Sequence, residues 1–189
     1  MSTLGIALLV ILGVIVLLIF MVIGIYNSLI TLRNQVKNAW AQIDVQLKRR
    51  HDLIPNLIET VKGYMGHERQ TFEAITQARS NAMNAKTVAE KGQAEGILSG
   101  MMGRLQVAVE AYPELKANQN FLALQEELTS TENKISYSRQ SYNDQVLFYN
   151  NKKQVFPSNI IAGMFNFADE TFFEIQDQAE KAVPKVSFS

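Results

Sequence analysis

The sequence lacks cysteine altogether among its 189 residues. This absence excludes disulfides, thiolate nucleophiles and cysteine metal sites, and it leaves the redox compartment undetermined. Net charge is lacking too, because eighteen basic residues balance eighteen acidic ones. No strongly basic field draws the chain to nucleic acid, so we expect no such partner. With only four prolines and ten glycines, the chain permits long helices.

A catalytic arrangement is missing as well. The two histidines, His51 and His67, are each followed by an acidic residue. Neighbours on a helix point about 100° apart, so neither pair chelates one ion by itself. Gly96, Gly100 and Gly103 follow no predicted strand and therefore form no phosphate loop. With no nucleophile placed beside a base, we predict no enzyme activity, no catalytic residue, no metal and no cofactor.

What the sequence does have is a charge-free run of twenty-two residues at positions 4–25. As a helix rising ~1.5 Å per residue it would cover roughly 33 Å, about the hydrocarbon thickness of a bilayer. We therefore predict a transmembrane helix after a short tail at residues 1–3. A cleaved signal peptide is the alternative, but no basic segment precedes the run and no small-x-small site follows it. Representative anchor residues are Leu4, Ile11, Val16, Phe20 and Ile25.

The basic residues near this span lie on its C-terminal side: Arg33, Lys37, Lys48, Arg49 and Arg50. Cytoplasmic flanks of membrane spans carry an excess of Lys and Arg. We therefore expect a single-pass protein whose soluble module is cytoplasmic.

Beyond the span, apolar residues recur at alternating steps of three and four. This period of about 3.5 residues predicts a helix that packs against other helices in a bundle or coiled coil. No Gly or Pro lies between Ile25 and Arg50, so span and helix are expected to form one continuous rod. The packing seam is predicted at Tyr26, Leu29, Val36, Trp40, Ile43, Leu47, Ile54, Leu57 and Val61.

Three residues disturb this seam. Arg33 and Arg50 occupy seam positions, where each would either snorkel or find a carboxylate such as Asp44 or Asp52, or a partner on another helix. An equal alternative is that the helix packing opens at these two positions and leaves the arginines in solvent. Pro55 removes a backbone donor, so we expect the helix to kink or restart near Asp52.

Further helices are predicted at about 68–86, from about 95 to just before Pro113, and at about 120–155. The predicted fold is thus all-α: a transmembrane helix that runs into a long antiparallel bundle of three to four helices over residues 26–155.

Residues 156–189 form a Phe-rich C-terminal segment. A helical projection places Ile161, Phe165, Ala168, Phe172 and Ile175 on one face and acidic residues on the other, which predicts an amphipathic helix. This helix would lie in a bilayer interface, pack on the module's own helices, or fill a groove on a neighbouring subunit. Its acidic polar face disfavours an anionic membrane.

Three stretches resemble the LemA family of bacterial membrane proteins: YNSLITLRNQVKNAWAQIDVQLKRRHDLIPNLIETVKGYMGHE at 26–68, ELTSTENKISYSRQSYNDQVLFYN, and FPSNIIAGMFNF. The resemblance implies an N-terminal helix in the bacterial inner membrane, a long antiparallel helical module at 26–155 and no catalytic residues. Some relatives are associated with internal membrane formation, which suggests a role in membrane organisation.

Two functional hypotheses follow. The leading one is a membrane-anchored, self-associating helical scaffold that organises membrane or partner proteins, with the lipid bilayer and a second copy of the chain as partners. The alternative is a signalling or proteolysis adaptor that binds another membrane or cytoplasmic protein through Lys48, Arg49 and Arg50. Candidate interaction residues are Arg33, Arg49, Arg50, Phe165 and Phe172.

Overall fold

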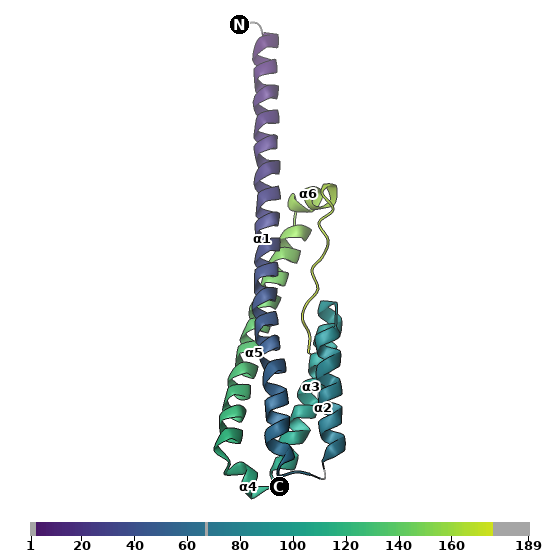
Figure 1. Cartoon of the computed structure of the whole chain (residues 1–189). Coiled ribbons are helices and arrows are strands. Elements are labelled where there is room, and N and C mark those ends of the chain that lie inside the picture. The colour runs from purple at the N-terminus through teal and green to yellow at the C-terminus, as the bar shows by residue number, and fades with distance from the viewer. Residues whose placement is uncertain (1–2, 67, 176–189) are drawn as a thin grey trace, which may run out of the picture. The chain divides into compact units, whose positions relative to one another are not determined.

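The computed structural model describes residues 3–66 and 68–175, and all regular secondary structure within these ranges is helical (Figure 1). The helices are α1 (Thr3–Lys62), α2 (Arg69–Asn84), α3 (Val88–Val109), α4 (Pro113–Lys116), α5 (Gln119–Gln154) and α6 (Ser158–Met164). The predicted all-α class, with a long apolar N-terminal helix leading into a helical bundle, is therefore confirmed.

The chain divides into two compact units. Residues 1–40 and 141–170 make unit 1, and residues 41–140 and 171–189 make unit 2. Helices α1 and α5 each contribute residues to both units.

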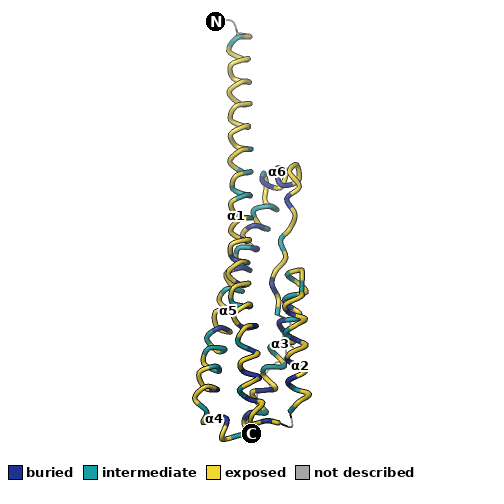
Figure 2. Tube along the Cα trace, in the orientation of Figure 1, coloured by how far each residue is buried: buried dark blue, intermediate teal, exposed yellow. Residues whose placement is uncertain are grey.

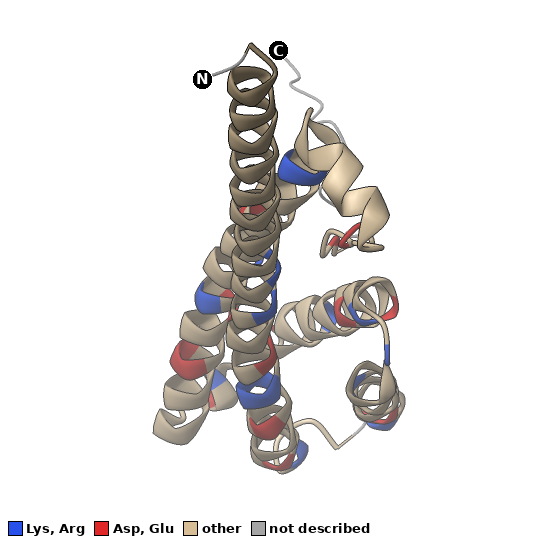
Figure 3. Ribbon diagram, turned by 90° about the horizontal axis from the view of Figure 1, so that it is seen from above, with Lys and Arg blue, Asp and Glu red and all other residues tan. Residues whose placement is uncertain are grey.

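The N-terminal part of α1 presents apolar side chains to its surroundings all the way round (Figure 2). Leu4, Ile11, Val16 and Phe20 are exposed, and Ile25 is half-buried. Figure 3 shows the same stretch free of charged residues. Among the described residues, α1 is the one helix long and apolar enough to cross a membrane. Its length and apolar composition are those of a single membrane anchor.

Helix α1 passes through Pro55 and ends at Lys62, so the expected restart near Asp52 is wrong. A proline has no N–H to donate to the carbonyl four residues earlier, which here belongs to His51. That carbonyl is satisfied by another helix, because Arg79 Nε donates to it over 2.6 Å. Asp52, instead of capping a helix, pairs with Lys48 Nζ at 2.8 Å.

In unit 2, α2 and α3 lie side by side (Figure 1). Helix α3 begins at Val88, earlier than predicted, because Thr87 and Glu90 form a capping box: the Thr87 hydroxyl accepts from Glu90 N, and the Glu90 carboxylate accepts from Thr87 N. The core of this unit is a cluster of buried apolar side chains that includes Ile54, Leu57, Val61, Phe72, Ile75, Leu98, Leu105, Val109 and Phe121.

The predicted C-terminal amphipathic helix is shorter than expected. Within the described chain it is limited to α6, and residues 165–175 are not helical. Asn166 adopts a left-handed conformation (φ 54°) that ends the helical path, a conformation to which asparagine is well suited. Residues 176–189 of the predicted segment lie outside the described residues.

Side chains of α5 supply the backbone hydrogen bonds that a longer helix would have made. The Asn150 side chain donates to Glu170 O over 2.9 Å and accepts from Glu170 N over 3.0 Å. The Tyr149 hydroxyl donates to Ala168 O over 2.9 Å. Tertiary contacts of this kind override a local helical pattern, because they leave few backbone groups unpaired.

Within unit 2, residues 171–175 pass directly over Gly92 of α3. A Cβ atom at Gly92 would lie 2.4 Å from the Glu174 carbonyl oxygen, so only glycine allows this approach. Phe173, next to Glu174, is fully buried, and the segment is thereby fixed to unit 2 by packing.

Candidate functional site

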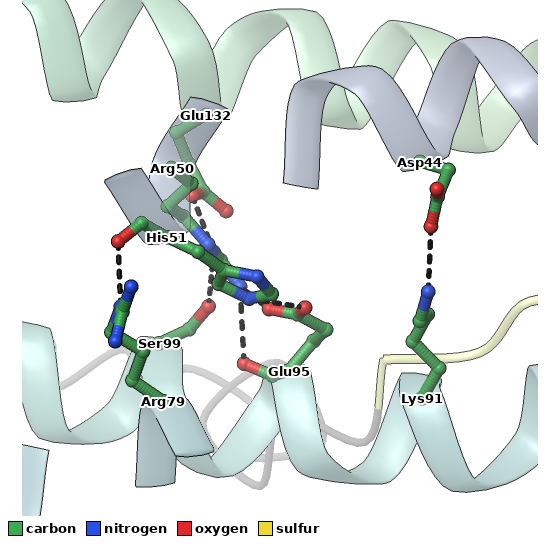
Figure 4. Close-up of polar contacts among 8 residues, drawn as sticks. All are labelled: Asp44, Arg50, His51, Arg79, Lys91, Glu95, Ser99 and Glu132. Carbon is green, nitrogen blue, oxygen red and sulfur yellow. Dashed lines mark hydrogen bonds and ion pairs between the residues drawn. The ribbon is translucent and has the colours of Figure 1, made fainter. Parts of the chain in front are cut away.

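A buried charge cluster in unit 2 joins three helices (Figure 4). Arg50 of α1 is 3% exposed and Glu95 of α3 is 0% exposed, and the two form an ion pair. The second amino group of Arg50 donates to Ser99 Oγ over 2.9 Å and lies 2.6 Å from a carboxylate oxygen of Glu132 on α5. The seam arginine therefore has its partners on other helices, which was one of the two alternatives left open by the sequence.

His51, the residue after Arg50 on α1, contacts the other carboxylate oxygen of Glu95 (Figure 4). Its Nε2 lies 2.8 Å from Oε1 of Glu95, and its ring is buried. Glu95 thus contacts a guanidinium through one carboxylate oxygen and an imidazole through the other, and its side chain has no exposed surface. Glu132, by contrast, keeps about half of its side-chain surface in solvent.

The electrostatics favour the ionised pair despite burial. Burial works against the charged form of Glu95, but the contacts with His51 and Arg50 outweigh it and lower the pKa of Glu95 below its ordinary value. Burial likewise works against the charge on Arg50, yet Glu95 and Glu132 together raise the Arg50 pKa. The cluster is therefore a fixed ionic joint between α1, α3 and α5 in unit 2.

A cavity of about 350 Å³ adjoins this joint. Arg50, Ser99 and Glu132 stand on its wall, and its remaining lining is largely apolar. Its apolar lining residues are Leu57, Met102, Leu105, Val109, Phe121 and Leu128. Because the one buried guanidinium is already matched by two carboxylates, the cavity offers no free positive charge to an anionic ligand.

The basic residues beside the joint are also engaged within unit 2. Arg49 pairs with Glu127, and Lys48 pairs with Asp52. Of the three residues assigned to the adaptor hypothesis, Arg50 is thus buried and the other two face carboxylates of the same chain. The basic stretch is not an open positive surface, which weakens the basis of that hypothesis.

Arg33, the other seam arginine, lies in unit 1 and packs against an aromatic ring. Its guanidinium carbon is 5.3 Å from the centroid of the Phe167 ring, within the range of a cation–π interaction. Tyr26 contacts both Phe167 and Phe165, with ring centroids 5.7 and 4.8 Å apart. Phe165 is otherwise exposed, as is Phe172, whereas Phe167 and Phe173 are the buried phenylalanines of this segment.

The predicted packing seam of α1 lies mostly inside the molecule. Tyr26 and Trp40 are half-buried, and the Trp40 ring lies 5.3 Å from that of Tyr142 in unit 1. The buried seam residues are Leu29, Val36, Ile43, Leu47, Ile54, Leu57 and Val61.

Sequence reasoning missed Glu95, Ser99 and Glu132. The predicted helix began near Glu95, and that residue was given no packing role. The available signal was the Thr87–Glu90 spacing, which places the helix start earlier and brings Glu95 onto the buried face with Leu98. Within the described residues, no group of three His, Cys, Asp or Glu side chains is arranged to hold a metal ion. His67 lies outside the described residues.

Comparison with known proteins gives concordant matches. The model of the LemA family matches residues 39–188. Protein LemA of Metamycoplasma hominis is 28% identical over 163 residues, which cover 84% of this chain and 73% of that protein. Magnetosome protein MamQ 2 of Paramagnetospirillum magneticum is 21% identical over 175 residues, and MamQ of Magnetospirillum gryphiswaldense is 20% identical over 174. The chain spans 64% of the length of each of these two magnetosome proteins.

Proposed function

Because the chain belongs to the LemA family, we propose that it is a membrane-anchored, self-associating helical scaffold that organises membrane or partner proteins without catalysis. The observation that carries this proposal is the continuity of α1, a single helix of 60 residues that combines the apolar span with bundle-forming residues. Two of the relatives are named as magnetosome proteins, which supports a role tied to membranes.

The module lies on the cytoplasmic side of a bacterial inner membrane in this proposal. The support is the positive charge that follows the span, since the first two charged residues after it are Arg33 and Lys37. A cysteine introduced at an exposed position after the span would react with a membrane-impermeant maleimide only in broken cells. Labelling of that cysteine in intact cells would reverse the assigned orientation.

Self-association is proposed to involve the span itself, since much of the α1 seam beyond it is already buried within the chain. Gly13 and Gly24 are eleven residues apart and therefore fall on nearly the same face of the helix. Neither has an atom within 4 Å of where its Cβ would lie. Small residues of this kind allow the backbones of two membrane helices to approach closely.

The test is the mass of the full-length protein in mild detergent and in lipid nanodiscs, measured across a wide range of concentrations. We expect oligomers that the double substitution Gly13→Leu and Gly24→Leu weakens. Val14→Leu is the matched control, because it adds bulk to a neighbouring face of the same helix. A strictly monomeric parent protein in both media would refute self-association.

A further inference from the structure

The end of the membrane span is marked by a contact within unit 1. Tyr26 is the first residue after the apolar run, and its ring packs on Phe165, which directly follows α6. Figure 1 shows α6 beside α1. Because Tyr26 lies one residue beyond the hydrocarbon-spanning stretch, Phe165 and α6 lie at the level of the membrane surface.

Most of the exposed side chains on and around α6 are apolar, and Asn159 and Asn166 are the exposed polar ones. We call this apolar surface the α6 patch. Phe156 is 79% exposed and Met164 is 68% exposed, and it is the grouping of such side chains into one patch that is informative. The α6 patch comprises Val155, Phe156, Ile160, Met164 and Phe165.

The α6 patch lies within a stretch without charge. Residues 155–168 contain no Asp, Glu, Lys or Arg, and Figure 3 shows α6 free of both charge colours. On α1, the first charge after the span is Arg33, and its guanidinium packs on the Phe167 ring. The nearest charges flanking α6 on the adjoining chain, Lys153 and Asp169, form an ion pair with each other. At the depth of Tyr26, both α1 and α6 are therefore without charged side chains.

The opposite side of α6 fixes it in place. Ser158, Ile161 and Ala162 are buried, and Phe167 N donates to Ala162 O over 3.0 Å. The chain after α6 is held by the hydrogen bonds of Asn150 with Glu170. The α6 patch is thus presented by a supported element and cannot turn its apolar side chains inward without breaking these contacts.

We propose that the α6 patch is a second membrane contact, which inserts into the interfacial layer of the same bilayer that α1 crosses. The occupant is lipid because the patch is continuous with the span through the Tyr26–Phe165 contact. Interfacial elements bury their apolar face ~5–10 Å into the boundary between headgroups and acyl chains. The absence of charge makes this contact independent of anionic lipid. It does not depend on self-association of the chain.

The absence of native cysteine allows a direct test in the full-length protein. Single cysteines are introduced by Phe156→Cys and Met164→Cys and labelled with a small fluorophore. The protein is placed in nanodiscs of zwitterionic lipid, sorted to hold one copy each, with or without brominated acyl chains. Phe20→Cys serves as the lipid-embedded control. Asn38→Cys serves as the aqueous control, since Asn38 is exposed on α1 and lies about 20 Å along the helix from Ile25.

We expect labels at positions 156 and 164 to be quenched by brominated lipid several-fold more than the label at 38, and to be protected from aqueous iodide. Adding anionic lipid should leave both values unchanged. Met164→Glu in the Phe156→Cys protein should reduce the lipid quenching several-fold, because it places a charge in the patch. The proposal is overturned if the labels at 156 and 164 behave like the label at 38. It is also overturned if they become protected only in discs that hold two copies, since a second chain would then cover the patch.

Discussion

The ionic joint predicts an unequal response at two adjacent arginines. Arg50→Met removes the guanidinium that neutralises Glu95, while the buried carboxylate keeps only His51 beside it. Arg49→Met removes the partner of Glu127, in a pair whose side chains are 46% and 38% exposed. The two substitutions are chemically identical and lie at adjacent positions, so a difference between their effects on stability reports the difference in burial of the two arginines.

The expected costs follow from these environments. Breaking a buried ion pair by removing one partner typically costs about 3–5 kcal/mol, because the remaining charge is left in the interior. An exposed pair contributes about 0.2–1 kcal/mol. Arg50→Met should therefore lower the free energy of unfolding several times more than Arg49→Met. The second partner of Arg50, Glu132, is half exposed and remains hydrated when the arginine is lost.

The assay is urea unfolding of the full-length protein in mild detergent, followed by circular dichroism at 222 nm and extrapolated linearly to zero urea. The double variant Arg50→Met with Glu95→Gln provides the decisive control. It removes the uncompensated charge and leaves an amide beside His51, so it should recover more than half of the loss caused by Arg50→Met alone. Equal losses for Arg49→Met and Arg50→Met, or no recovery in the double variant, would refute the reasoning.

Three further predictions concern single contacts. Because the pKa of Glu95 is lowered in the folded protein, its contribution to stability is full above the ordinary value of 4.5 and is lost as pH falls through the lower folded-state value. Glu95→Gln should therefore reduce the loss of stability at acidic pH. If the free energy of unfolding of this variant falls with pH as in the parent protein, other carboxylates cause the loss. Arg79→Leu should cost about 1–3 kcal/mol, because it leaves a buried carbonyl unpaired. The cost should be smaller in a Pro55→Ala background, where an N–H is restored, and equal costs in urea melts of both backgrounds would contradict this account. Gly92→Ala should increase proteolysis and hydrogen exchange of residues 171–175, whereas Gly100→Ala, with no atom within 4 Å of the added Cβ, should leave both unchanged; identical exchange in the two variants would remove the steric argument.

The anchor and the long helix could be predicted from the sequence because both depend on local patterns. An uncharged run of sufficient length needs no tertiary partner to be read as a span. The 3.5-residue period from Tyr26 onward likewise reports one face of one helix. The all-helical class followed from these two features and from the scarcity of proline and glycine.

Prediction from the sequence failed where a residue distant in the chain supplies a hydrogen bond or an ion pair that no local pattern shows. Pro55 removes one hydrogen bond from α1, and only the position of Arg79 in the fold shows how the carbonyl is satisfied. The segment after α6 has a helical apolar pattern, but Asn150 and Tyr149 hold its backbone in another form. The partners of Arg50 could not be predicted for the same reason, since Glu95 and Glu132 are 45 and 82 residues away in the chain.

The contact between Tyr26 and Phe165 has a practical consequence for purification. Anchored proteins are commonly made soluble by deleting the span, which in this chain would place the new N-terminus at Tyr26. Such a shortened protein would still display the five apolar side chains around α6, and it would have lost the adjacent span. It would bind detergent or precipitate as a folded protein, and its poor behaviour would be mistaken for misfolding. The full chain in lipid is therefore the appropriate sample for measuring its stability and assembly.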